Sequence, residues 1–297
     1  MNILMTGGTG LIGRAFIRQY PEHTFTVLTR TPKLSQRSLG SHINLIESLE
    51  DLHDLNGFDA VINLAGEPII DKRWSDKQKA IICNSRWHIT KHLVDLFNHS
   101  DQPPKVFLSG SAIGVYGHQG DTELLEDSPT GQPDFPTEVC SNWESIALNA
   151  NGVTRVVLLR TGIVLAKQGG ALAKMLLPFK LGLGGPIGQG RQYMSWIHLQ
   201  DHIRAMAYLL EQPDLSGPVN LTAPTPQPNR QFSQTLARVL KRPAFLPMPP
   251  LIMRMALGES ACLLLDSQNV IPNKLENSGF EFRYRELEPA LNDLINQ

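Results

Sequence analysis

Closely spaced glycines near the amino terminus suit the binding of a pyrophosphate. The run reads Gly7-Gly8-Thr9-Gly10-Leu11-Ile12-Gly13 and lies between a short apolar segment and an amphipathic one. Glycine permits a tight turn at positive φ and lets a phosphate approach the backbone, while a helix that begins there offers free N–H groups. Because an expected strand, helix and second strand stand in the required order, the run predicts a dinucleotide-binding turn.

The end of the expected second strand distinguishes the two nicotinamide dinucleotides. Sites for NAD place Asp or Glu at this point to bind the ribose hydroxyls. This chain has Leu28-Thr29-Arg30-Thr31-Pro32 and no carboxylate. A guanidinium can bind a 2′-phosphate through two hydrogen bonds, so Arg30 predicts NADP(H). The alternative interpretation is that Arg30 is a solvated loop charge.

A few side chains could move a proton, and each also has a plain structural interpretation. Tyr116 follows an expected strand near the point where a substrate carbonyl would lie. Cys140 lies on an apolar helix face, which favours a core thiol over a nucleophile. No Gly-x-Ser-x-Gly elbow occurs, which argues against a nucleophilic hydrolase. Further titratable candidates are Glu67, Glu138 and His198.

Composition places the chain among ordinary globular proteins. Of its 297 residues 41% are hydrophobic and 19% are charged, and the formal net charge is -1. This balance gives no electrostatic reason to expect a nucleic acid or an anionic membrane as partner. The three cysteines form no Cys-x-x-Cys pair, so no disulfide framework or zinc site is predicted. No apolar run approaches the roughly 20 residues of a membrane span, and we expect a cytoplasmic protein without a metal.

The elements that would position these residues alternate along the first two-thirds of the chain. Short apolar runs predict strands, and amphipathic stretches between them predict helices. The repeated order of strand and helix indicates an α/β, doubly wound parallel sheet of the Rossmann type. The expected strands are 2–6, 24–29, 43–46, 59–65, 105–109 and 153–159, and the expected helices are 11–20, 75–97 and 135–150.

The composition of the chain changes after Thr161, where glycines and then prolines become frequent. A helix over 171–181 interrupts the glycine-rich stretch, and a helix over 199–211 precedes a strand over 218–221. We expect an NADP(H)-binding domain over 1–165, rejoined by about 195–221. Residues 166–194 and 222–297 would form a smaller, discontinuous C-terminal substrate lobe.

Several motifs together resemble one protein family. The Gly-x-x-Gly-x-x-Gly turn is similar to that of the extended short-chain dehydrogenase/reductase superfamily. The match is narrowed by Asn63-Leu-Ala-Gly-Glu67, Ser109-Gly-Ser-Ala-Ile-Gly-Val-Tyr-Gly117, Leu159-Arg-Thr-Gly-Ile-Val-Leu165 and Ser195-Trp-Ile-His198. These stretches resemble the YfcH-type family, described as nucleoside-diphosphate-sugar epimerase-like, over essentially the whole chain.

The resemblance implies a set of cofactor-binding residues at the carboxyl ends of the strands. The glycine turn would hold the pyrophosphate, the segment after the second strand the adenosine ribose, and later strand ends the nicotinamide. The residues so implied are Gly7, Thr9, Gly10, Leu11, Ile12, Gly13, Thr29, Arg30, Leu64, Ala65, Gly66, Arg86, Ser109, Arg160 and Ile163.

The chain departs from the superfamily in its proton chemistry. Epimerases and reductases of the superfamily use Tyr-x-x-x-Lys on one helix, where the lysine lowers the tyrosine pKa. None of the five tyrosines is followed by a lysine at that spacing. Counting back from Glu144 places Cys140 at the lysine position and Pro136, or its neighbour Phe135, at the tyrosine position. The resemblance places Ser111 near the superfamily's catalytic serine, so Tyr116 and Ser111 become the candidate catalytic residues.

Two functions of different classes remain open at this point. The first is an NADP(H)-dependent oxidoreductase or epimerase-like enzyme for a small polar, possibly nucleotide-linked, substrate. Hydride transfer needs only the cofactor and correct positioning, so loss of the tyrosine does not abolish it. The second is a non-catalytic NADP(H)-binding sensor. A monomer and a homodimer are both compatible with the sequence.

Overall fold

The computed structural model describes residues 1–296, and strands and helices alternate along their first two-thirds. The strands of the central sheet are β1 (Asn2–Thr6), β2 (Thr24–Leu28), β3 (Asn44–Ile46), β4 (Ala60–Asn63), β5 (Val106–Ala112), β7 (Arg155–Thr161) and β11 (Gly217–Leu221). The helices around it are α1 (Leu11–Gln19), α2 (Pro32–Leu39), α3 (Asp76–His99), α4 (Phe135–Leu148) and α6 (Leu199–Glu211). The short 3-10 helices η1 (Leu49–Asp51) and η2 (Ile113–Tyr116) follow β3 and β5.

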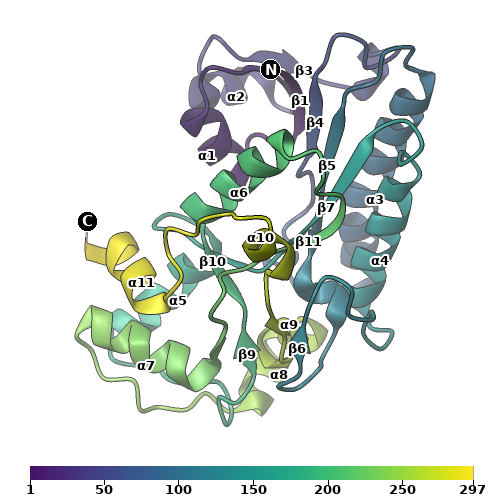
Figure 1. Ribbon diagram of the computed structural model, residues 1–297. Helices are drawn as coiled ribbons and strands as arrows, with labels where there is room; N and C mark the ends of the chain where they lie inside the picture. The colour runs from purple at the N-terminus through teal and green to yellow at the C-terminus, as the bar shows by residue number, and fades with distance from the viewer. Residues whose placement is uncertain (297) are drawn as a thin grey trace.

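The central sheet has seven strands in the order β11-β7-β5-β4-β1-β2-β3, and every neighbouring pair is parallel. Parallel strands require crossover helices, which lie on both faces of the sheet (Figure 1). The predicted doubly wound Rossmann fold is therefore confirmed. The strand order reverses between β1 and β4, and the carboxyl ends at such a switch point are where ligands bind.

Alternation along the strands divides the sheet's core in two. Ile3 and Met5 of β1 pack with α1 and α6, whereas Leu4 packs with α3 and α4. Both faces are thus buried, which explains why these strands are near-continuously apolar in sequence. On α4 the apolar face predicted from spacing is buried, including Val139 and Trp143.

A second apolar core lies outside the central sheet. It is built by α5 (Gly170–Lys180), α7 (Asn229–Leu240), α11 (Leu287–Asn296) and the strand β10 (Trp196–His198). Trp196, Phe232 and Leu291 are completely buried there. In Figure 1 these helices lie together at the lower left, away from α3 and α4. The proposed division of the chain into domains stays a prediction.

Short strand pairs join distant parts of the chain. β8 (Ile163–Leu165) pairs with β10, and β9 (Tyr193–Met194) pairs with β12 (Gln227–Pro228). β6 (Glu123–Leu124) pairs with β13 (Asn269–Val270). The remaining elements are the helices α8 (Pro250–Leu257), η3 (Gly258–Ala261), α9 (Cys262–Leu265) and α10 (Asn273–Asn277).

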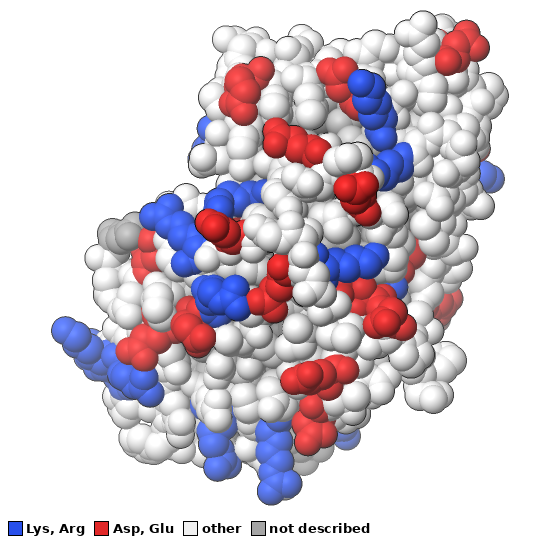
Figure 2. Space-filling view, viewed as in Figure 1, with Lys and Arg blue, Asp and Glu red and all other residues white. Residues whose placement is uncertain are grey.

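Charge is dispersed over the visible surface. On the face shown in Figure 2, acidic and basic side chains alternate without a broad area of one sign. Within residues 1–296 no helix has both the length and the apolar character needed to cross a membrane.

Candidate functional site: the carboxyl edge of the central sheet

The glycine turn connects β1 to α1 and is packed too tightly for side chains at two positions. Gly7 has φ +70°, and a Cβ there would stand 2.5 Å from the carbonyl carbon of Leu64, at the end of β4. A Cβ at Gly13 would stand 2.6 Å from the Gly7 carbonyl oxygen. Both contacts are with backbone, which cannot move aside. The turn is therefore pressed against the neighbouring strand on one side and against its own helix on the other.

Gly10 differs from these two glycines. It is the N-cap of α1, its φ is -75°, and a Cβ would meet only the Gly7 carbonyl oxygen at 3.1 Å. No side chain caps the helix, and no acidic residue lies in its first turn. Within residues 1–296 no acceptor is assigned to the backbone N–H groups of Leu11, Ile12 and Gly13. These donors and the helix dipole suit a phosphate anion.

Thr29 and Arg30 follow β2 with opposite exposures. The buried Thr29 hydroxyl lies 2.7 Å from the Ser35 hydroxyl and accepts a bond from the Thr31 N–H, so it fixes the start of α2. The Arg30 side chain is exposed. The pKa of Glu67 is lowered chiefly by a hydrogen bond from Lys72 and more weakly by the charge of Arg30. Arg30 thus lies on the side of the molecule where the loop after β4 runs, and its side chain is accessible to solvent.

The loop after β4 is anchored to β1 and covered by α3. The Leu64 N–H donates to the Thr6 carbonyl, and the Ala65 N–H donates to the Thr6 hydroxyl at 3.2 Å. A Cβ at Gly66 would stand 2.8 Å from Cζ of Arg86, so the guanidinium lies directly over this glycine. Arg86 also lies over the Trp143 ring, 5.3 Å from its centroid. The structure brings together these residues of the predicted cofactor site.

Beyond β5 the predicted site residues belong to a buried polar network. Ser111 Oγ donates to Glu144 Oε1 at 2.6 Å, and Arg160 binds both oxygens of Glu144 at 2.9 and 2.8 Å. The Tyr116 hydroxyl, on a completely buried side chain, accepts a bond from Arg160 and donates to Asn220 Oδ1 at 2.7 Å. Each of these polar groups is therefore satisfied by protein.

The electrostatics of this network follow from burial. Burial raises the pKa of Tyr116, and the adjacent Arg160 opposes the shift. Burial alone would lower the pKa of Arg160, but the hydrogen bonds and charge of Glu144 outweigh it and raise that pKa. Arg160 consequently stays charged. Its guanidinium, which the family resemblance placed near the nicotinamide, is hydrogen-bonded to Glu144, Tyr116 and the Glu126 carbonyl.

The other sequence candidates are spread over the molecule. Glu138 is exposed on α4. His198 caps α6 by accepting from the Gln200 N–H, and it faces Asp293 at 3.3 Å. Burial raises the pKa of Cys140 to about 12, which keeps the thiol protonated. The hydroxyl of Ser109 is buried without a hydrogen-bond partner among residues 1–296. Ile163 begins β8 next to the Ser195 carbonyl.

Sequence reasoning missed two members of the network. Asn220, on β11, joins Tyr116 to the Ile271 carbonyl. The buried carboxylate of Glu126 accepts from the backbone N–H groups of Asn220 and Lys274. Neither residue belongs to a recognisable motif. The pairing of β11 with β7 brings Asn220 to the site, and the loop after β6 brings Glu126 there, so no local signal could have found them.

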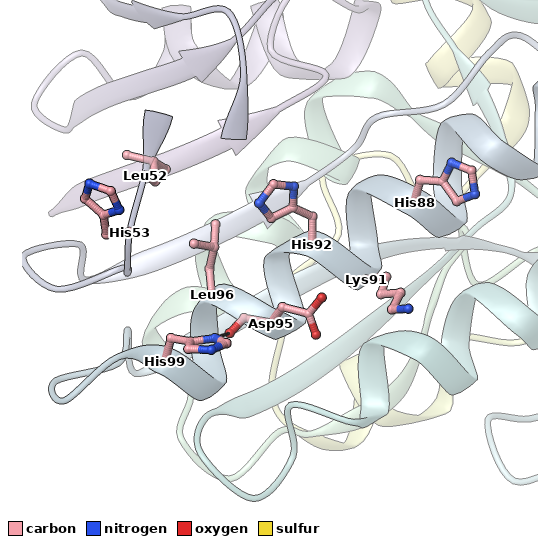
Figure 3. Close-up of a pocket in the computed structure, with 8 residues that line it drawn as sticks. All are labelled: Leu52, His53, His88, Lys91, His92, Asp95, Leu96 and His99. Atoms are coloured by element: carbon pink, nitrogen blue, oxygen red, sulfur yellow. Dashed lines mark hydrogen bonds between the residues drawn. The ribbon is translucent and has the colours of Figure 1, made fainter. Parts of the chain in front are cut away.

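Two hollows in the surface lie away from the residues predicted to bind a cofactor. One, of about 470 Å³, lies on the outer face of α3 opposite the segment after η1 (Figure 3). Its lining residues are Leu52, His53, His88, Lys91, His92, Asp95, Leu96 and His99. Within residues 1–296 no three His, Cys, Asp or Glu side chains are placed to hold a metal ion.

The second hollow, of about 840 Å³, lies between the loop after η2 and the turn before β9. Its lining includes Arg191, Tyr193 and Arg230 but no predicted cofactor residue. We base the site on the strand ends, because the glycine packing and the free N–H groups are there.

Comparison with known proteins agrees with this geometry. Residues 3–221 match the model of the NAD-dependent epimerase/dehydratase family, which spans the whole central sheet. The chain belongs to this family. Residues 248–294 also match a domain model described as of unknown function (DUF1731). The resemblance to extended short-chain dehydrogenase/reductases is thereby confirmed.

Individual members of the family are similar over almost the full chain. The chloroplastic "Epimerase family protein SDR39U1 homolog" of Arabidopsis thaliana is 39% identical over 99% of this chain and 87% of its own length. The crystal structure of human epimerase family protein SDR39U1 with NADPH has a TM-score of 0.91 and 34% identity, covering 100% of this chain and 99% of that one.

A third relative is a larger protein. The structure described as the nucleoside-diphosphate sugar epimerase from Corynebacterium glutamicum is 31% identical, with a TM-score of 0.78. It covers 98% of this chain, but the match takes up 57% of that chain.

Proposed function

We propose that this chain is an NADP(H)-dependent oxidoreductase or epimerase-like enzyme that acts on a small polar substrate, either free or linked to a nucleotide. The observation that carries the proposal is the uncapped amino terminus of α1 beside Gly7 and Gly13, at the strand-order reversal. Backbone donors without acceptors, in a turn that excludes side chains, fit a pyrophosphate. The NADPH in the human relative's crystal structure supports the same assignment.

The residues present fit the rest of the dinucleotide. Arg30 stands at the end of β2 with an accessible guanidinium and no carboxylate beside it in sequence, which suits the 2′-phosphate. The segment Leu64–Ala65–Gly66 has no bulky polar side chain and would pass beneath the dinucleotide. When bound, NADP(H) supplies or accepts a hydride. The protein's own contribution would be to orient the two partners and to exclude water.

A proton donor must come from a different arrangement than in other superfamily enzymes. Pro136, or its neighbour Phe135, stands where the tyrosine is expected, and Cys140 stands where the lysine is expected. None of these side chains exchanges a proton at neutral pH, since burial raises the pKa of Cys140 to about 12. Ser111 and Tyr116 remain the proposed candidates. Ser111 donates to a buried carboxylate, and Tyr116 is bonded to Arg160 and Asn220. A proton released by either hydroxyl would have to be replaced through this network.

The absence of a tyrosine–lysine pair favours a second candidate function. A protein that keeps the dinucleotide site without a tyrosine–lysine pair could be an NADP(H) sensor. In either case we propose a cytoplasmic monomer or homodimer whose ligands are small molecules.

Turnover separates the two candidates. Purified protein with NADPH is tested against a panel of aldehydes, ketones and activated alkenes, with NADPH fluorescence as the signal. An enzyme oxidises NADPH with at least one class of substrate, and the Gly10→Val variant does not. Tight NADPH binding without turnover over a broad panel would favour the sensor. We expect no epimerisation of UDP-glucose, since that reaction requires the tyrosine–lysine pair.

A further inference from the structure

Arg86 is a cation without an acidic partner. Its side chain projects from α3 and is half-buried between Gly66 and the Trp143 ring. Nη1 donates to the Ile82 carbonyl at 2.9 Å, and Nη2 donates to the Glu67 carbonyl at 3.1 Å. Among residues 1–296 no carboxylate lies within ion-pair distance of Arg86, and no acceptor is assigned to its Nε. The buried Arg160, by contrast, binds both oxygens of Glu144.

Partial burial of the Arg86 charge costs free energy, and a bound ligand could offset this cost. The half-buried side chain, packed between Gly66 and Trp143, is partly withdrawn from water, and this burial lowers the pKa of Arg86. A desolvated cation is stabilised when an anion or further acceptors complete its hydrogen bonds. The Nε edge lies over Gly66, where no side chain intervenes. An acceptor brought by a bound molecule could therefore reach it.

The position of Arg86 in the sheet indicates which part of a dinucleotide it would meet. Arg30 follows β2, the glycine turn follows β1, and Gly66 with Arg86 lies beyond β4, towards β5. The strands stand in the order β2-β1-β4-β5. A dinucleotide with its 2′-phosphate at Arg30 and its pyrophosphate at the glycine turn would extend towards β4 and β5. Its nicotinamide ribose would then lie beside Arg86.

Arg86 also lies close to the residue that occupies the lysine position. Its guanidinium lies 5.3 Å from the centroid of the Trp143 ring, and Trp143 is three residues after Cys140 on the buried face of α4. The charge of Arg86 acts to lower the pKa of the Cys140 thiol, but burial outweighs it and raises that pKa. The thiol itself stays neutral. The chain thus keeps a positive charge at this point, but the charge comes from α3 instead of α4.

We propose that Arg86 binds the nicotinamide-ribose half of the dinucleotide and supplies there the positive charge that a lysine at position 140 would otherwise supply. The inference rests on the proposed NADP(H) binding. It makes Arg86 a positioning residue that acts on one half of the cofactor only.

Ligand fragments test this assignment by binding alone. The compound 2′,5′-ADP carries the adenosine half with its 2′-phosphate but lacks the nicotinamide ribose. We expect Arg86→Met to weaken NADPH binding about 10- to 150-fold, as for loss of a charge-assisted contact, and to leave 2′,5′-ADP within about twofold. Arg30→Met should weaken both ligands. Lys91→Met, an exposed cation on the same helix, should change neither.

Isothermal calorimetry on the three variants gives an unambiguous outcome. Equal weakening of NADPH and 2′,5′-ADP by Arg86→Met, or no weakening of NADPH, would overturn the assignment. If Arg86→Met loses its native circular dichroism, Arg86→Lys decides instead: a selective loss of NADPH affinity supports the proposal, and an equal effect on both ligands refutes it. An unaltered protein that binds neither ligand would refute the proposed function itself.

Discussion

Two regions at the same edge of the central sheet use polar groups in opposite ways. At the turn between β1 and α1 the donors are backbone N–H groups, and they have no acceptor within residues 1–296. At the ends of β5 and β7 the donors and acceptors are side chains that bind one another. The first region is open to a ligand, whereas the second is closed by its own hydrogen bonds.

This difference in hydrogen bonding indicates a different role for each region. An unsatisfied donor costs little at the surface and gains when an anion arrives. A buried network stabilises the strands only while every member is present. Here it also ties distant segments together, because Glu126 bonds the backbone of Asn220 on β11 and of Lys274 on α10. Substitutions in the two regions should therefore have different signatures, affinity in one and stability in the other.

The largest effect is expected in the closed region. Glu144→Ala leaves the charge of Arg160 buried and unpaired, since the two side chains are only 9% and 6% exposed. Loss of one partner of a buried ion pair costs about 3–5 kcal/mol of unfolding free energy. Urea denaturation followed by circular dichroism measures this. Glu138→Ala, an exposed carboxylate on the same helix, is the matched control and should cost less than about 0.5 kcal/mol.

A similar small loss in both variants would mean that solvent or a neighbouring group compensates Arg160. The network would then be less closed than its distances imply, and the contrast between the two regions would weaken.

The second effect belongs to the open region and should appear in binding instead of stability. Gly10→Val places a branched side chain where the pyrophosphate would approach, while its ordinary φ of -75° tolerates a Cβ. We expect NADPH affinity to fall about 100-fold or more, which corresponds to about 2.7 kcal/mol. Native circular dichroism should be retained.

Gly7→Val is the comparison variant for this experiment. Its φ of +70° and the 2.5 Å approach to Leu64 predict a misfolded or strongly destabilised protein. If Gly10→Val binds NADPH normally and is folded, the phosphate is not held at this turn.

The same contrast explains how much the sequence could predict. The glycine turn is a local feature: three glycines, a strand and a helix within about twenty residues carry its physics. Its position, the Rossmann fold and the buried face of α4 were all predicted correctly. The network depends instead on partners that are distant in sequence. Ser111 and Glu144 are 33 positions apart, and Tyr116 and Asn220 are 104 apart.

For this reason the roles of Tyr116 and Ser111 could not be read from spacing. Sequence placed both hydroxyls near the end of β5, but only the tertiary structure shows which groups already bind them. Arg86 is an intermediate case. Its position on α3 was visible in sequence, whereas the missing acidic partner and the contact with Gly66 became apparent only from the packing.

The smallest effect on stability is expected for Tyr116, whose hydroxyl belongs to the closed region and is also a proposed proton donor. Tyr116→Phe removes one hydroxyl from a completely buried ring and leaves Arg160 Nη1 and Asn220 Oδ1 with one partner fewer. Unsatisfied buried groups of this kind cost about 1–3 kcal/mol. Denaturation should show that loss, and Tyr193→Phe, whose hydroxyl makes no hydrogen bond within residues 1–296, serves as control.

If Tyr116 is instead a proton donor, NADPH oxidation with any substrate found should slow roughly 10²- to 10⁴-fold. A loss of stability with an unchanged rate would mean that Tyr116 has a structural role only. A slowed rate with little stability loss would mean that the phenol leaves its network during turnover, and the closed region would then be part of the active site.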